Sequence, residues 1–312
     1  MTNLTDPIYN DEATAREHFE NIRWPDGPVC PHCGTIDRVK PLGGKSMGPG
    51  WYHCGACRDK FTVRVGTVYE RSKIPLHKWI LATHLLAASK KGMSAHQLHR
   101  MLGVTYKTAW FMTHRIRKAM RETSSGLGGG GSTVEVDETY WGNTKPRGQK
   151  KGRGGEHKEK VLTLLERKGR AHSFHVPKVN AETLRPIIKE QIKADTHIMT
   201  DEAAVYCLSK EPLSKDFQSH NYVRHNIGEY VRGDIYTNTI ENCFSILKRG
   251  LTGTYQHVSK TLLKRYLCEF DFRYNYRYDI SQKTGYNDME RTNVALKGIE
   301  GKRLTYCQVT SR

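Results

Sequence analysis

The spacing of apolar residues along the chain predicts helices first and a mixture of strands and helices beyond residue 132. The stretch that begins at Pro75 is apolar on every side, which indicates a helix packed among other elements. Ser94 and Thr105 stand at expected helix N-caps, and Gly103 separates the two helices that they would begin. Later elements are expected as strands at 133–141, 160–166, 170–176 and 196–200 and as helices at 181–194, 261–276 and 288–296.

Two Cys-x-x-Cys pairs lie early in the chain, with 20 residues between them: Cys30, Cys33, Cys54 and Cys57. Thiolates at this spacing can converge tetrahedrally on one zinc ion. A disulfide framework would need an oxidising compartment, whereas the acidic N-terminus lacks the layout of a signal peptide. A thioredoxin-like redox site would have a single pair in a βαβ unit. We therefore predict a zinc ribbon whose Zn²⁺ is structural, because zinc ribbons are folded by their metal.

The two helices around Gly103 have the outline of a helix-turn-helix DNA-binding motif. The second helix carries side chains of the types that contact DNA: Tyr106, Lys107, Thr108, His114, Arg115 and Lys118. The alternative is a plain helical hairpin with a solvated basic face. Both interpretations fit this segment when it is considered by itself.

The charge balance favours a polyanionic partner. The chain of 312 residues has 50 Lys and Arg against 32 Asp and Glu, and the resulting net charge of +18 is spread along its length. No run is long and apolar enough to span a membrane, and no basic amphipathic helix has a Trp/Phe face. We therefore expect a cytoplasmic protein that binds nucleic acid and no membrane.

Two predicted strands carry an aspartate, and a carboxylate in a buried strand needs a reason. Asp137 lies inside the strand at 133–141, and Asp201 follows the strand at 196–200. Parallel pairing of these strands would bring the carboxylates together, and such a pair repels unless a cation such as Mg²⁺ lies between them. The alternative for Asp137 is an exposed edge strand whose charge discourages aggregation.

Glu241 is the candidate third ligand, at the start of a helix that also carries Lys248 and Arg249. Asn238 and Glu241 have the spacing of a capping box, so Glu241 could instead reach back to the helix start while Asn238 caps it. Asn238 is also an alternative metal ligand.

Two glycine-rich polar stretches flank the strand at 133–141. Residues 124–132 have the composition of a flexible linker. Residues 145–160 are strongly basic, and the candidate phosphate contacts in them are Lys145, Arg147, Lys150, Lys151 and Arg153. The alternative for the basic stretch is a solvated hairpin tip.

These motifs together resemble insertion-sequence transposases of the IS1595 family, which are ISXO2-like and related to the Merlin elements. The resemblance rests on the zinc ribbon, the helix-turn-helix, Val-Glu-Val-Asp-Glu-Thr-Tyr-Trp-Gly142, Asp201-Glu, Tyr236-Thr-Asn-Thr-Ile-Glu-Asn and the following Leu-Lys-Arg-Gly-Leu-Thr-Gly-Thr-Tyr255. It implies a catalytic acidic triad of Asp137, Asp201 and Glu241. It also implies that Lys248, seven residues after Glu241, contacts the end of the element.

The resemblance implies a multidomain fold. A zinc ribbon plus an all-α helix-turn-helix would precede an α/β RNase H-like catalytic domain with a mixed sheet. The expected division is a helical lead-in at 1–24, the ribbon at 25–70, the helix-turn-helix domain at 71–123, the linker at 124–132, the catalytic domain at 133–280 with its basic loop at 145–160, and a C-terminal extension at 281–312.

The implied activity is that of a DDE-type transposase. Such an enzyme binds the terminal inverted repeats of its element, then cleaves and joins DNA by two-metal phosphoryl transfer. It would use two Mg²⁺ or Mn²⁺ ions per active site besides one structural Zn²⁺, and it would bind double-stranded repeat and target DNA as a homodimer or higher oligomer. A bacterial, nucleoid-associated location accompanies this activity. The alternatives are a DNA-binding regulator without catalysis and a structure-selective RNase H-like nuclease.

Overall fold

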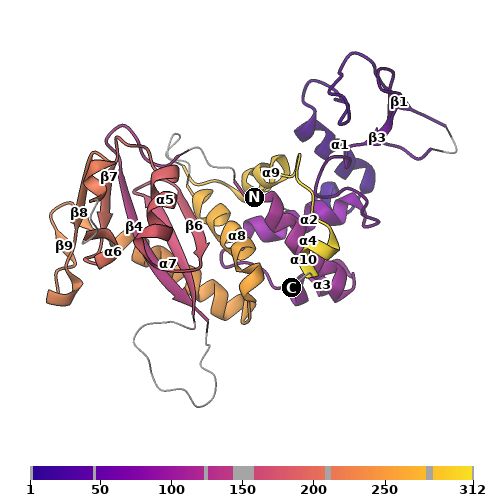
Figure 1. The fold of residues 1–312 in the computed structure, drawn as a ribbon. Helices are drawn as coiled ribbons and strands as arrows, with labels where there is room; N and C mark the ends of the chain where they lie inside the picture. The colour runs from indigo at the N-terminus through magenta and orange to yellow at the C-terminus, as the bar shows by residue number, and fades with distance from the viewer. Residues whose placement is uncertain are drawn as a thin grey trace. The chain divides into compact units, whose positions relative to one another are not determined.

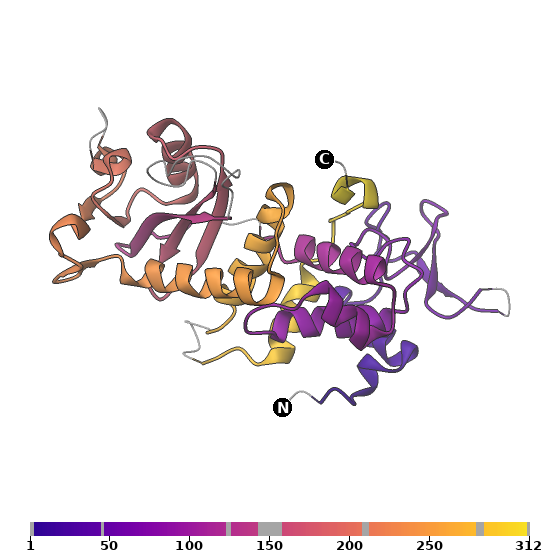
Figure 2. The same ribbon diagram turned by 90° about the horizontal axis from the view of Figure 1, so that it is seen from below.

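The computed structural model describes residues 3–44, 47–122, 126–142, 158–207, 212–278 and 284–310. The chain forms two compact units (Figures 1 and 2). The ribbon unit comprises Met1–Glu122 and Gly285–Arg312, and the sheet unit comprises Thr123–Thr284. The chain therefore leaves the ribbon unit, builds the sheet unit and then returns to the first.

The ribbon unit combines a small antiparallel sheet with helices. Its strands, in the order β1–β2–β3, are Val39–Leu42, Trp51–Cys54 and Lys60–Thr62. Its helices include α1 (Glu12–Arg23), α2 (Leu76–Ala88), α3 (Ala95–Leu102), α4 (Tyr106–Ala119), α9 (Asp288–Lys297) and α10 (Tyr306–Thr310). Two predicted N-caps are confirmed, because the Ser94 and Thr105 hydroxyls accept backbone hydrogen bonds at the starts of α3 and α4. Gly103 ends α3 in the left-handed conformation, with φ 61°.

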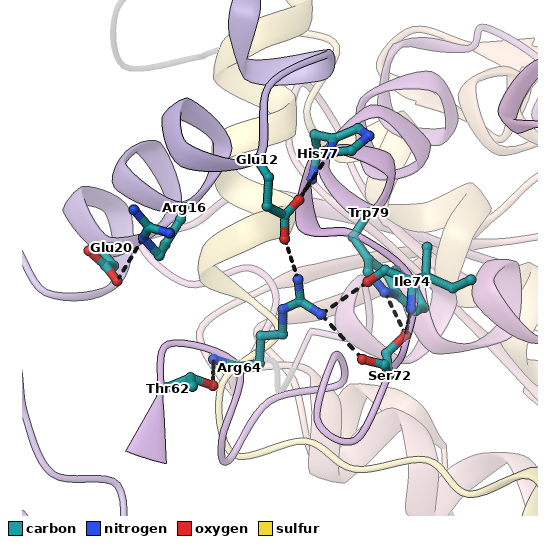
Figure 3. Close-up of polar contacts among 9 residues, drawn as sticks. All are labelled: Glu12, Arg16, Glu20, Thr62, Arg64, Ser72, Ile74, His77 and Trp79. Carbon is teal, nitrogen blue, oxygen red and sulfur yellow. Dashed lines mark hydrogen bonds and ion pairs between the residues drawn. The ribbon is translucent and has the colours of Figure 1, made fainter. Parts of the chain in front are cut away.

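Arg64 joins the end of the ribbon to the helices around it (Figure 3). Its Nη2 lies 2.6 Å from Oε1 of Glu12 in α1, and its Nη1 donates to the carbonyls of Ser72 and Ile74 at 3.2 and 3.0 Å. The other carboxylate oxygen of Glu12 accepts from the backbone N–H of His77 in α2 at 3.1 Å. One guanidinium and one carboxylate therefore fasten the ribbon to α1 and α2.

The C-terminal segment completes the ribbon unit. Helix α9 packs beside α2, where Nδ1 of His84 lies 2.8 Å from Oγ1 of Thr292. Nζ of Lys302 donates to the carbonyl oxygens of Ala119 and Arg121, both at 2.7 Å, where α4 ends. The described part of the expected C-terminal extension is thus packed into the same unit as the zinc ribbon.

The sheet unit is built on a five-stranded mixed sheet with the order β6–β5–β4–β7–β8. These strands are β4 (Thr133–Trp141), β5 (Glu159–Glu166), β6 (Ala171–Val176), β7 (His197–Thr200) and β8 (Ser219–Tyr222). The pairs β4–β5 and β5–β6 are antiparallel, whereas β4–β7 and β7–β8 are parallel. The predicted strand at 133–141 is confirmed, and it occupies the centre of the sheet. It is therefore not an exposed edge strand.

Helices cover both faces of this sheet (Figures 1 and 2). Helix α5 (Ala181–Gln191) packs on the face formed by Val134 and Val136 of β4. Helices α7 (Asn238–Gly250) and α8 (Leu263–Asn275) pack on the other face, against Val161 and Leu165 of β5. Side chains alternate between the faces of a strand, so the odd-numbered residues of β4 face α7. Further elements of the unit are α6 (Ala204–Cys207), β9 (Val231–Arg232) and β10 (Ile235–Tyr236).

The expectation of a flexible linker before β4 is wrong for the described part of that stretch. Leu127 is buried in the core that α5 covers. The backbone N–H of Gly129 donates to Oγ1 of Thr196 at 2.9 Å, and that of Gly130 donates to Oδ2 of Asp195 at 2.6 Å. The glycines adopt positive φ angles that bring the backbone close to these acceptors. Composition alone indicated flexibility because the acceptors lie more than 60 residues away in the sequence.

Replacement of Gly128 tests this packing. Gly128 has a φ of +76°, and a Cβ atom there would lie 2.3 Å from Oγ1 of Thr196. Gly130 has a φ of +61° and open space around its Cβ position, so Gly130→Ala carries the backbone cost alone. We expect Gly130→Ala to cost about 1–2 kcal/mol and Gly128→Ala about 1–3 kcal/mol more, seen as a larger fall in melting temperature by circular dichroism. Equal melting temperatures would contradict the packed arrangement.

Candidate active site and zinc centre

The four cysteines of the ribbon come together as the spacing predicts. All four Sγ atoms lie within 4.8 Å of one another. Sγ of Cys30 is 3.7 Å from that of Cys57, and Sγ of Cys33 is 3.6 Å from that of Cys54. A tetrahedral Zn²⁺ with Zn–S bonds of about 2.3 Å needs sulfur atoms about 3.8 Å apart. The thiolate cluster therefore fits a structural zinc ion.

Each Cys-x-x-Cys pair forms the same tight turn. The N–H of Gly34 donates to the carbonyl of Cys30 at 2.9 Å, and the N–H of Arg58 donates to the carbonyl of Cys54 at 2.8 Å. Both donors have a positive φ, 76° for Gly34 and 64° for Arg58. The two turns present their sulfur atoms to a common point, which is how a short ribbon forms a closed four-ligand site.

Cys57→Ser should remove the zinc ion and loosen the ribbon. We expect the variant to lose its bound zinc, measured by atomic absorption. Because the bound metal supplies folding free energy, the melting temperature of the ribbon unit should also fall. Cys307→Ser is the control, since Cys307 is an exposed thiol of the same unit. A variant that retains the full zinc content would contradict the four-thiolate site.

Asp137 lies on the α7 face of β4, and Asp201 directly follows β7, the parallel neighbour of β4. The parallel register pairs Thr133 with His197 and Glu135 with Met199, and Asp201 comes two residues after Met199. The negative charge of Asp201 acts on the carboxyl of Asp137. Oδ1 of Asp137 accepts the N–H of Glu138 at 2.7 Å. The convergence of the two aspartates on one cation stays a prediction.

The electrostatics of Asp137 are those of a buried acidic cluster. Burial raises the pKa of the Asp137 carboxyl well above its usual range, and the negative charges of Glu138, Asp201 and Glu241 raise it further. Burial is also the main cause of the raised pKa of Asp201, whose Oδ1 accepts the N–H of Ala203 at 3.0 Å. Three acidic side chains thus act on Asp137, which is a setting that favours a bound cation.

Glu241 reaches the cluster from the first turn of α7. Its Oε1 lies 3.4 Å from Nε2 of His225 and 3.5 Å from Oγ1 of Thr237. The carboxylate is about half exposed, with a side-chain accessibility of 46%. Among the described residues, the cysteines alone form a group of three or more metal-binding side chains whose ligand atoms lie within 4.8 Å of one another. The three carboxylates are therefore more widely spaced than a single small ion requires.

The capping-box interpretation of this helix start is wrong. Helix α7 begins at Asn238, which makes Thr237 the N-cap residue, and the side chain of Thr237 does not cap the helix. Glu241 is the fourth helical residue, and it points to His225 and Thr237 instead of reaching back to the N–H of Asn238. Asn238 is exposed beside it, and its role as a ligand stays a prediction.

The sequence alone indicates no role for Glu138 or Glu202, although both make hydrogen bonds to elements around the site. Glu138 lies on the α5 face of β4, where its Oε2 accepts the hydroxyl of Tyr206 at 2.6 Å. Glu202 accepts the backbone N–H groups of His225 and Asn226 at 2.8 and 2.9 Å. It therefore holds the loop that carries His225, the histidine beside Glu241. Two adjacent carboxylates after β7 were the only sequence signal for Glu202.

The structure separates the predicted DNA contacts of α4 into two groups. Tyr106 and Lys107 are exposed, and Thr108 and Lys118 are partly exposed. His114 and Arg115 are buried, so the prediction that they contact DNA is wrong. Arg115 donates to the carbonyls of Leu304 and Glu70 at 3.3 and 2.8 Å, and its guanidinium lies 5.0 Å from the ring of Phe111.

The remaining basic candidates lie on α7 and in the loop between β4 and β5. Lys248 and Arg249 are exposed in the last turn of α7. Nε of Arg249 donates to the carbonyl of Ser245 at 3.2 Å, which leaves the other guanidinium nitrogens of this side chain to reach outward. The predicted contacts of the basic loop lie outside the described residues: Lys145, Arg147, Lys150, Lys151 and Arg153.

Comparisons with known proteins agree with the ribbon and the acidic sheet. Residues 10–60 match the transposase zinc-ribbon domain, and residues 127–275 match the ISXO2-like transposase domain. The chain is 30% identical over 277 residues to a Halobacterium salinarum protein described as an uncharacterized protein in transposable element ISH50, with 84% of this chain and 90% of the relative covered. It is also 30% identical over 108 residues to an uncharacterized transposase-like protein of Haemophilus influenzae, covering 35% of this chain and 83% of the relative.

The matched domains define a protein of the insertion-sequence transposase class. The chain belongs to the IS1595 family of these transposases. Within the part of the chain that the structure describes, no helix is long and apolar enough to cross a membrane.

Proposed function

We propose that the protein is a DDE-type transposase that binds the terminal inverted repeats of its element and catalyses DNA cleavage and strand transfer. The observation that carries the proposal is the parallel pairing of β4 with β7, because Asp137 lies in β4 and Asp201 directly follows β7. Glu241 lies close enough to act electrostatically on Asp137. We propose these three carboxylates as the catalytic, metal-binding triad, with Asn238 as an alternative ligand.

We propose that the sheet unit is an RNase H-like catalytic domain. Numbered along the chain, its strands have the order 3-2-1-4-5, and only the first two pairings are antiparallel. The acidic side chains come from the first strand, from the end of the fourth and from the helix after the fifth. Helices cover both faces of the sheet, and Asp137 lies on the face that α7 covers.

The acidic cluster suits divalent cations, because the negative charges of Glu138, Asp201 and Glu241 all act on the carboxyl of Asp137. Bound there, Mg²⁺ or Mn²⁺ would lower the pKa of the attacking water or 3′-hydroxyl and stabilise the leaving oxygen. Asp137, Asp201 and Glu241 would hold these ions. His225 holds the Glu241 carboxylate from the side, with Nε2 at 3.4 Å.

The proposed reaction has two steps, and each step forms one bond to phosphorus while it breaks another. In cleavage, water attacks a phosphodiester at the element end, the bond from phosphorus to the 3′ oxygen breaks, and that oxygen leaves as a hydroxyl. In strand transfer, the freed 3′-hydroxyl attacks a target phosphodiester, and the target strand's own 3′ oxygen leaves. The same carboxylates serve both steps, because each step is an in-line displacement at phosphorus.

We propose that α3, Gly103 and α4 form a helix-turn-helix that contacts repeat DNA through Tyr106, Lys107, Thr108 and Lys118. The exposure of Tyr106 and Lys107 at the start of α4 supports this, since the N-terminal residues of a recognition helix contact base edges. Lys248 and Arg249 extend from α7 on the same helix as Glu241, which supports a contact to the phosphates next to the cleaved bond. The basic stretch at 145–160 is proposed as a further phosphate contact.

Two other functions use part of the same site. A DNA-binding regulator would need the ribbon and the helical pair, but it would have no use for a buried acidic cluster. A structure-selective nuclease would use the triad for cleavage without joining. Two paired element ends also need two active sites, so we propose a dimer or higher oligomer in the DNA complex.

Asp137→Asn tests the catalytic proposal. We expect cleavage and strand transfer with Mg²⁺ and the element's own ends to fall by at least about 10²-fold, because a ligand to the reacting groups is lost. Without Mg²⁺, the variant should melt higher than the wild type near pH 7, since a carboxyl whose pKa is raised on folding destabilises the folded state above the pKa of the unfolded chain.

Glu190→Gln, an exposed change on α5, is the matched control and should keep both activities. Strand transfer that survives in Asp137→Asn would remove the catalytic proposal. Cleavage without any joining by the wild type would favour the nuclease.

Lys107→Ala tests the proposed helix-turn-helix. Lys107 lies at the exposed start of α4, with Nζ 4.8 Å from the ring centre of Tyr306. Loss of one phosphate or base contact should weaken repeat binding and reduce the salt dependence of log K by about one unit. Fluorescence anisotropy with repeat DNA between 50 and about 200 mM salt measures both effects. Lys297→Ala, an exposed change on α9, should bind like the wild type, and equal binding by both variants would count against α4 as the contact.

A further inference from the structure

Glu135 is a fully buried carboxylate two residues before Asp137 on the same face of β4. Its side chain has no solvent exposure. A buried charge is costly unless other groups pair with it and satisfy its oxygens. The zinc site, the triad and the DNA contacts leave Glu135 unused, so its partners indicate what it does.

Both carboxylate oxygens of Glu135 have a partner outside β4. Oε1 accepts Nε of Arg167 at 2.7 Å. Oε2 accepts the backbone N–H of Ile240 at 2.9 Å. Ile240 is the third residue of α7 and directly precedes Glu241. The carboxylate therefore connects the strand that carries Asp137 to the helix turn that carries Glu241.

Arg167 extends the same connection to the segment that leads into α7. Its Nη1 donates to the carbonyl of Asp234 and its Nη2 to the carbonyl of Tyr236, both at 2.7 Å. Its guanidinium lies 3.5 Å from the ring centre of Tyr236. Its own backbone N–H donates to the carbonyl of Thr133 at the start of β4. Three guanidinium nitrogens thus hold β4 and the approach to α7 in one arrangement.

Helix α7 depends on Glu135 for its start. The side chain of the N-cap residue Thr237 does not cap the backbone N–H groups of the first turn. Glu135, a residue of β4, caps the helix instead. Its Oε2 accepts an N–H of the first turn, and its charge faces the positive end of the helix dipole. A cap supplied by a distant strand sets where the helix begins relative to that strand, which a local cap does not do.

We propose that Glu135 and Arg167 are positioning residues that set the distance between Asp137 and Glu241. The proposal rests on the proposed function, because it assigns these two residues to the geometry of the same triad. Neither residue touches DNA or the reacting groups. Their effect reaches the chemistry through the first turn of α7, where Ile240 and Glu241 are neighbours.

Glu135→Gln is the test variant. The amide keeps the shape of the side chain, but its NH₂ group must face either Arg167 or the N–H of Ile240, so one hydrogen bond is lost. We expect the cleavage rate at saturating Mg²⁺ to fall about 10- to 100-fold, because small misplacements of a catalytic group cost that much. The Mg²⁺ concentration that gives half the maximal rate should rise, while affinity for repeat DNA stays unchanged. Arg167→Lys keeps the positive charge but makes fewer hydrogen bonds. Its cleavage rate should therefore lie between the rates of Glu135→Gln and the wild type.

Glu269→Gln is the matched control. Glu269, on α8, is another carboxylate of the sheet unit without solvent exposure, and it pairs with Arg273 on the same helix and with Tyr255, which precedes that helix. It should lose thermal stability as Glu135→Gln does, yet it should keep the wild-type rate and Mg²⁺ requirement when both are assayed well below melting. If Glu135→Gln behaves like Glu269→Gln in these two kinetic measurements, its role is structural and the proposal is overturned.

Hydrogen exchange separates this proposal from the proposed function. Amide exchange in a peptide that covers the first turn of α7 should be faster in Glu135→Gln than in the wild type and in Glu269→Gln. A wild type that cleaves no DNA end would remove the proposed function, and the exchange measurement would still report on the connection between Glu135 and α7. Unchanged exchange in this turn would overturn the positioning role even if cleavage is slow.

Discussion

The parallel pairing of β4 with β7 is the constraint on which the candidate site depends. It joins the strand that carries Asp137 to the strand that Asp201 directly follows, and Asp137 lies on the face that α7 covers. A shift of one residue would turn every side chain of one strand to the other face and separate the carboxylates. Val134, Val136 and Ile198 oppose such a shift, because all three belong to the core on the α5 side. The hydrophobic pattern thus specifies where the acidic cluster forms.

The cluster carries an electrostatic cost, because burial and the negative charges of its neighbours raise the pKa of Asp137. Glu135 shows the contrasting solution on the same strand, because Arg167 and a helix N–H satisfy it permanently. One strand therefore has a carboxylate that the protein itself neutralises and another that is left for a ligand. This difference separates a structural acid from a candidate catalytic acid.

Patterns that act locally could be predicted from the sequence. The β-branched alternation of β4, the caps at Ser94 and Thr105 and the paired cysteines each depend on neighbours within a few residues. The mistakes depend on distant partners. The group that caps α7 could not be predicted, because it is Glu135, about 100 residues earlier. Arg115 was taken for a DNA contact because its acceptor on Leu304 lies in the returning C-terminal segment.

The central claim is that Asp137, Asp201 and Glu241 form one divalent-metal site. Anomalous diffraction from crystals of the full chain grown with Mn²⁺ tests it most directly, because manganese reveals its own position and its ligands. The account predicts two manganese peaks, each within about 2.5 Å of a carboxylate oxygen of the triad, with Asp137 shared between them. Crystals with Mn²⁺ bound elsewhere and no peak beside Asp137 would contradict the account.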